Sequence, residues 1–244
     1  MIDLNKLPTY RTYNFCFENW FRDIQPNGST LNEKQKREMI QMIDSQVESK
    51  RNLLFLIYDY LVEIGDNKND FYTIERIIVL AWLFIAQTTA DCMVACKYFL
   101  ISDTDYDRQF MRGKLKVIFN EGIKKLIGFS TGGKKETVWG SISQIINRFS
   151  ETYRKQYLEL DKLLKKHASQ SSWWKETRDA ETHFDSLNLF LSRQESVDES
   201  TVMIESLQLI GALDSVSHFL HNLHACTTNW LNNQYKNHPE QFTD

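Results

Sequence analysis

Apolar residues recur at intervals of three and four along most of the chain, a spacing that places side chains on one face of an α-helix. The pattern is clearest over residues 39–64, 110–126, 139–160 and 184–191, and no segment shows a sustained alternation of period two. That alternation is typical of half-buried strands. The sequence therefore predicts an all-α bundle of five to six helices.

Capping residues and glycines give the expected start and end of the first helix. Ser29 or Thr30 can accept hydrogen bonds from its first turn, and Gly65 stands where its apolar periodicity stops. We expect a long helix between them, either straight or kinked near Ser49.

The second helix is expected over residues 74–100, and it is apolar nearly all round. Such a helix belongs at the centre of a bundle. We expect Cys92 and Cys96 to be buried there as small apolar residues rather than to bind a metal. Asp91 lies on the same helix, and a carboxylate there is costly unless it meets an Arg or His from a neighbouring helix.

The remaining helices follow from the same signals, and they define one domain. The third is capped by Asp103 or Thr104 and ends at Gly128, and the later ones are expected over residues 136–166, 173–191 and 201–235. We interpret residues 29–235 as one all-α domain, residues 1–28 as an aromatic lead-in packed on it, and residues 236–244 as a polar tail.

Composition narrows the setting in which such a bundle works. The net charge of −3 gives no global basic field for nucleic acid, so any RNA contact would need a local patch. Four cysteines in 244 residues are too few for a disulfide framework. The longest apolar run, residues 77–86, is about half of the ~20 residues of a spanning helix. We expect a cytoplasmic protein without a membrane partner.

Two further patterns suggest ligands. Gly128, Gly133 and Lys134 have the spacing of a phosphate-binding loop, but Lys135 replaces the hydroxyl residue and a helix precedes the loop where a strand is needed. We therefore expect a glycine cap and no nucleotide cofactor.

His218, His221 and His224 recur every three residues on the last helix, with Asp214 one turn earlier. Neighbouring members of this row could share a metal if another helix completed the site. The favoured interpretation is a stripe of hydrogen-bonded histidines without a metal.

Arg178 and His183, with four residues between them and Asp179 directly after the arginine, form the most informative motif. Asp179 and His183 lie one helical turn apart, so the carboxylate can orient the imidazole and raise its pKa. A guanidinium suits a phosphate, and an imidazole suits proton transfer from a ribose 2′-hydroxyl.

This motif resembles the RX4–6H signature of the HEPN superfamily, whose members are small all-α domains. The resemblance implies an RNA-binding protein or a metal-independent endoribonuclease without a cofactor, of the kind found in toxin–antitoxin or phage-defence systems. It also implies a homodimer that brings two motifs together, and an antitoxin or other protein as a further partner. The alternatives are a catalytically inactive helical interaction module and a metal-binding bundle that uses the histidine row.

Overall fold

The computed structural model describes residues 31–65, 70–128, 137–170 and 199–237, and nearly all of these residues are helical, with no strand among them. The predicted all-α class is confirmed. The expected lead-in over residues 1–28 and the expected helix over residues 173–191 lie outside the described residues. The described helices are α2 (Glu33–Ile64), α3 (Asp70–Ile101), α4 (Asp105–Ile127), α5 (Val138–Ile145), α6 (Glu151–Gln170) and α9 (Glu199–Asn237), with a 3-10 turn, η2 (Ile146–Arg148), after α5.

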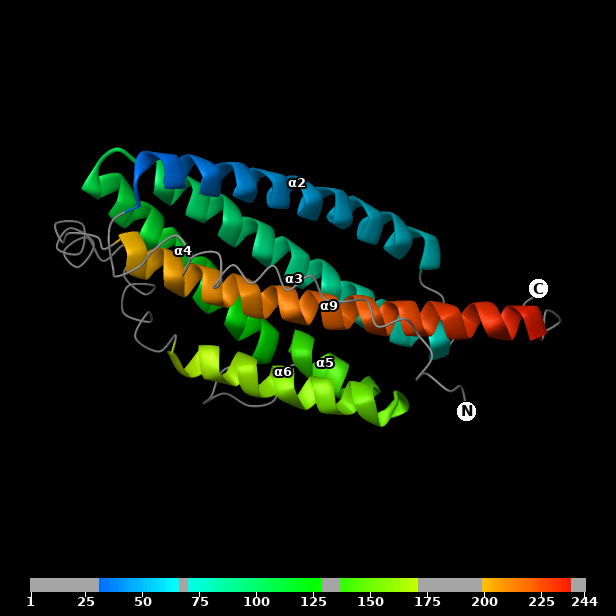
Figure 1. The fold of residues 1–244 in the computed structure, drawn as a ribbon. Coiled ribbons are helices and arrows are strands. Elements are labelled where there is room, and N and C mark those ends of the chain that lie inside the picture. Colours follow the sequence, from blue (N-terminus) through cyan, green and yellow to red (C-terminus); the bar gives the residue numbers. More distant parts are fainter. Residues whose placement is uncertain (1–30, 66–69, 129–136, 171–198, 238–244) are drawn as a thin grey trace.

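Helix α3 is the centre of the bundle, as its apolar sequence predicts. It packs against α2, α4, α5 and α9, and α6 joins the bundle through α9 and α4. Figure 1 shows α2 along one edge, α9 crossing in front of α3, and α5 and α6 on the opposite side from α2. The largest side chains with almost no exposed surface include Ile78, Ile85, Met93 and Phe99 of α3 and Met203 and Leu207 of α9.

Helix α2 begins later than expected, because Asn32 caps it. The Asn32 side chain accepts from the backbone N–H groups of Lys34 and Gln35, and the Gln35 side chain accepts from the Asn32 N–H. This reciprocal capping box satisfies N–H groups that a helix start otherwise leaves unpaired. The helix then continues without a break at Ser49 and ends at Gly65, whose φ of 52° favours glycine.

Both ends of α4 follow the sequence. Thr104 caps the start by accepting from the Asp107 N–H, and Gly128 ends the helix with a φ of 85° while its N–H bonds to the Lys124 carbonyl. Between these ends, a Cβ atom on Gly122 would lie 2.9 Å from a methyl of Thr88. Glycine therefore allows α3 and α4 to approach closely.

The prediction of one continuous helix over residues 136–166 is wrong. The structure divides it into α5, the turn η2 and α6, and Phe149 between them has extended backbone. The apolar spacing continues through the break, since Ile145, Ile146 and Tyr153 still pack on the core. Periodicity alone could not reveal the break for this reason.

Helix α3 differs from expectation in two respects. Asp91 is exposed and accepts a hydrogen bond from Gln87 on the same helix at 2.8 Å, so it needs no Arg or His from a neighbour. Residues 71–101 are also long and apolar enough to cross a membrane by length and composition, and 61% of their most apolar stretch is buried in the bundle. A buried core helix of a soluble protein meets the same criteria.

Candidate functional site

Arg178, Asp179 and His183, the residues of the predicted motif, lie outside the described residues. Their contacts therefore stay predictions. The described part of the chain contains the histidine row and two clusters of buried charged groups.

The histidine row lies on α9, and its members have different surroundings. Within the described residues, no group of three or more His, Cys, Asp or Glu side chains is arranged to hold an ion. His218 and His221 are exposed, whereas His224 is turned toward α3. Asp214, the carboxylate that might have joined the row, instead bonds to Lys50 of α2 at 2.5 Å.

The most chemically distinctive arrangement in the described residues is a carboxylate–imidazole pair between α3 and α9. Glu75 has no exposed surface, and its Oε1 is hydrogen-bonded to Nδ1 of His224. Its Oε2 accepts from the Thr227 hydroxyl. The His224 side chain is 22% exposed, so the pair links a fully buried carboxylate to a partly accessible ring.

Tyr60 adds a third helix, α2, to this cluster. Burial, together with the nearby Glu75 carboxylate, raises the pKa of the Tyr60 hydroxyl well above its usual range, and the hydroxyl is hydrogen-bonded to Glu75. The Tyr60 ring meets the His224 ring edge-on with 5.0 Å between centroids. Tyr60, Glu75, His224 and Thr227, which we name the Glu75 cluster, therefore connect α2, α3 and α9.

An indole covers the histidines on their other side. The Trp82 ring lies 5.2 Å from that of His221 and 5.8 Å from that of His224, and its Nε1 donates to the Ser217 hydroxyl at 2.9 Å. Partial burial, followed by the nearby His224 and His218, lowers the pKa of His221. His221 and His224 thus have specific ring or hydrogen-bond partners, whereas His218 is exposed.

In chemical terms, the Glu75 cluster fixes the orientation of an imidazole. A carboxylate bonded to Nδ1 selects the tautomer or charge state of the ring, as it does in many acid–base and metal sites. The sequence indicated His224 but missed Glu75 and Tyr60. The available signal was a glutamate near the start of a largely apolar helix, because a buried glutamate must find a partner.

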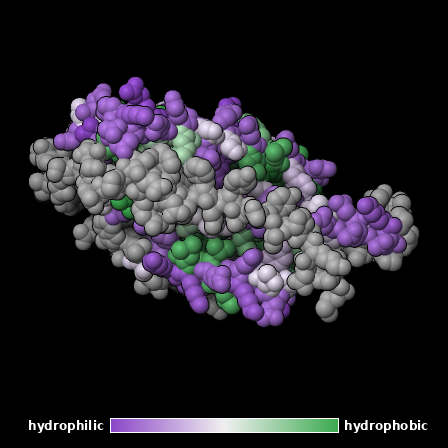
Figure 2. Space-filling model, in the orientation of Figure 1, coloured by the Kyte–Doolittle hydropathy of each residue, from purple (hydrophilic) through white to green (hydrophobic). Residues whose placement is uncertain are grey.

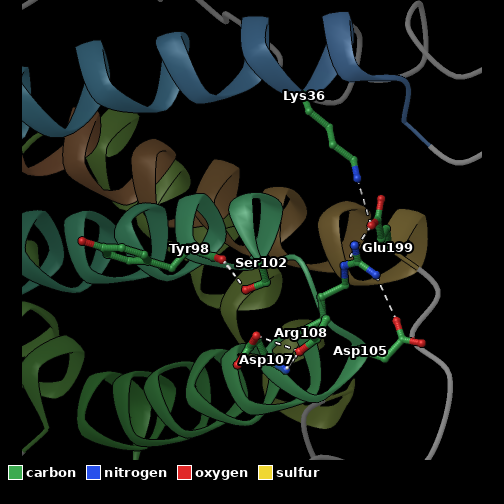
Figure 3. A network of polar contacts seen from close by, with 8 residues as sticks. Lys36, Tyr98, Ser102, Asp105, Asp107, Arg108 and Glu199 are labelled. Carbon is green, nitrogen blue, oxygen red and sulfur yellow. Dashed lines mark hydrogen bonds and ion pairs between the residues drawn. The ribbon is translucent and has the colours of Figure 1, made fainter.

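A second network joins the first turns of α2, α4 and α9 (Figure 3). Glu199, the first residue of α9, is only 8% exposed, and its Oε1 lies 3.1 Å from Lys36 Nζ of α2 and 3.2 Å from Arg108 Nε of α4. Arg108 also bonds to Asp105 at 3.0 Å. Lys36 and Arg108 thus place two positive charges beside the buried Glu199 carboxylate, and these contacts hold the start of α9 against α2 and α4.

The cysteines follow the structural interpretation. Cys92 and Cys96 have no exposed surface, and burial raises the pKa of the Cys92 thiol well above its ordinary value and that of Cys96 to about 12. Such thiols stay protonated and are poor nucleophiles or metal ligands.

Comparison with protein-family models, with curated proteins and with solved structures finds no match to this chain. The case for a function therefore rests on the residues themselves.

Proposed function

We propose that this protein is a HEPN-like RNA-binding protein or metal-independent endoribonuclease in which Arg178 and His183 are the catalytic pair. The observation that carries the proposal is the sequence motif itself, an arginine and a histidine separated by four residues with Asp179 beside the arginine. The all-α architecture of the described residues is the fold class that this resemblance implies.

The three side chains have complementary roles in the proposed reaction. Arg178 stabilises the charge on the scissile phosphate. His183 takes a proton from the ribose 2′-hydroxyl and returns one to the leaving oxygen, and Asp179 orients the imidazole. No cofactor takes part, and a homodimer supplies two motifs to one RNA.

Expression with and without His183→Ala tests this function. We expect wild-type protein to slow growth and, once purified, to cleave RNA in the presence of a metal chelator, and we expect His183→Ala to do neither. His218→Ala is the matched control, because it removes an exposed histidine outside the motif. Equal RNA cleavage by the wild type and His183→Ala, or cleavage by neither, would contradict the ribonuclease function.

A second candidate, a helical interaction module, is favoured by one specific observation. Phe55, Leu56, Tyr58 and Val62 are each 58–68% exposed on the C-terminal half of α2, and Figure 2 shows apolar surface over this part of the helix. Loss of the cellular phenotype in a folded Phe55→Ser, Val62→Ser double variant, with the phenotype intact in His183→Ala, would favour this candidate over the ribonuclease.

A further inference from the structure

One face of α3 carries a heptad-spaced stripe of side chains that the other described helices leave uncovered. Its positions are separated alternately by three and four residues, the spacing of the a and d positions in a coiled coil. We call this face the α3 stripe. It consists of Ile77, Leu80, Phe84, Gln87, Asp91, Val94, Tyr98 and Ile101.

The α3 stripe is exposed over most of its length. Leu80, Val94, Tyr98 and Ile101 have 37–51% of their surface exposed, although they lie on the most apolar helix of the protein. Gln87 and Asp91, at the middle of the stripe, are exposed as well. The helix therefore buries three sides and leaves one apolar side without a partner in the described chain.

The α3 stripe lies on the face of α3 between its contacts with α2 and its contacts with α4. On one side, Lys97 of α3 bonds to Asp44 of α2 at 2.6 Å. On the other side, Thr88 approaches Gly122 of α4, and Lys125 of α4 lies 5.9 Å from the centre of the Phe84 ring. A helix from another molecule could therefore approach α3 between these two neighbours.

We propose that the α3 stripe binds the same stripe of a second copy of this chain, in an antiparallel and two-fold symmetric pair. Symmetry about the middle of the stripe would place Gln87 of each copy opposite Asp91 of the other. A side-chain amide has two N–H donors, so Gln87 can keep its hydrogen bond to Asp91 of its own helix and donate the second N–H to Asp91 of the other copy.

The same symmetry matches the apolar positions. Ile77 falls opposite Ile101, Leu80 opposite Tyr98, and Phe84 opposite Val94, with a and d positions sharing each layer as antiparallel packing requires. No layer pairs an apolar side chain with a polar one. A stripe that is complementary to itself in this order favours a second copy over an unrelated partner.

The polar centre also favours protein over lipid. The stripe is about 36 Å long, so in a membrane-spanning helix Gln87 and Asp91 would lie near the middle of the bilayer, where a carboxylate is costly. With a width of about 10 Å, the stripe has roughly half of the area that each partner buries in a standard interface, which is about 800 Å². The flanking helices α2 and α4, with the exposed Phe110 on α4, would supply the rest.

Light scattering of the full chain tests the pairing. We expect a dimer at micromolar concentration, and we expect Val94→Glu to raise the dissociation constant at least about tenfold, because a carboxylate would face Phe84 of the other copy. Leu158→Glu is the matched control. Leu158 is 56% exposed on α6, away from α3, so this variant should stay dimeric.

A charge exchange tests the register of the pair. Gln87→Glu would set two carboxylates against each other and weaken the dimer about tenfold, and adding Asp91→Lys would restore it by placing opposite charges in register. Circular dichroism verifies that each variant is folded. The pairing does not depend on the ribonuclease function, because these positions lie outside the proposed motif.

Three results would overturn the pairing. The first is a monomeric wild-type protein, and the second is a dimer that Val94→Glu leaves unchanged. The third is flotation of the wild type, but not of Val94→Glu, with phosphatidylcholine–phosphatidylglycerol vesicles, which would assign the stripe to lipid.

Discussion

Removing the imidazole of the Glu75 cluster should destabilise the fold strongly, because it leaves a fully buried carboxylate without one of its partners. Leaving a buried polar group without one of its hydrogen-bond partners costs about 1–3 kcal/mol, and more when the group is charged. Thr227 and Tyr60 still donate to Glu75, so we expect His224→Ala to lower the free energy of unfolding by about 2–4 kcal/mol. In a chain of this size that loss corresponds to a melting temperature lower by about 4–16 °C.

A double-mutant cycle separates the energy of the Glu75–His224 contact from the energy of packing the His224 ring against Tyr60 and Trp82. Glu75→Leu, His224→Ala and the double variant are compared by urea unfolding, followed by circular dichroism and tryptophan fluorescence. Once Glu75 is gone, loss of His224 no longer leaves a buried carboxyl group without a partner, so the double variant should be more stable than the sum of the single effects predicts. Additivity within about 0.5 kcal/mol would refute the coupling of these two residues.

Three other outcomes follow from local contacts. Gly211→Ala should raise the melting temperature, since no atom lies within 4 Å of the added Cβ. Gly122→Ala should not raise it, because the added Cβ would lie too close to a methyl of Thr88. Equal effects of the two variants would show that α3 and α4 can separate freely. The thiol of Cys96 should resist alkylation at pH 8 until the protein is unfolded, because it is buried and its pKa is raised to about 12; rapid labelling of native protein would contradict this. The pKa of His221 is lowered in the folded state, so the unfolded chain takes up the proton first and stability falls as the pH drops below the unfolded pKa. His221→Gln should therefore lose less stability than the wild type between pH 7.5 and 5.5. An equal loss in urea titrations would contradict a lowered pKa of His221.

The sequence predicts what depends on one helix and its neighbours along the chain. Apolar spacing predicted the helical class, the apolar circumference of α3 predicted its central position, and Thr104 and Gly128 marked both ends of α4. Each of these outcomes is decided locally, by the face a helix must bury or by backbone groups that must find a cap.

The sequence misses what depends on contacts between distant helices. Glu75 and His224 are 149 residues apart, and Lys36 and Glu199 are 163 residues apart, so no spacing rule joins them. Asp91 shows the opposite error. A carboxylate on an apolar helix suggested burial, but its angular position places it on the one exposed face of α3.

Three pairs of residues that are distant in the sequence determine how α9 lies along the bundle. Glu199 meets Lys36, and fifteen residues later Asp214 meets Lys50, which is fourteen residues after Lys36 on α2. The nearly equal intervals show that α2 and α9 run in the same direction with matched rise, and His224 then meets Glu75 on α3.

Apolar contacts between long helices tolerate a slip of one turn more readily than ion pairs do, because a slip of about 5.4 Å still opposes one apolar face to another. The same slip would separate all three pairs at once and leave the buried carboxyl groups of Glu75 and Glu199 without these partners, at a cost of about 1–3 kcal/mol each and more for a charged group. The apolar residues therefore bring α9 to the bundle, and the three polar pairs select one register for it.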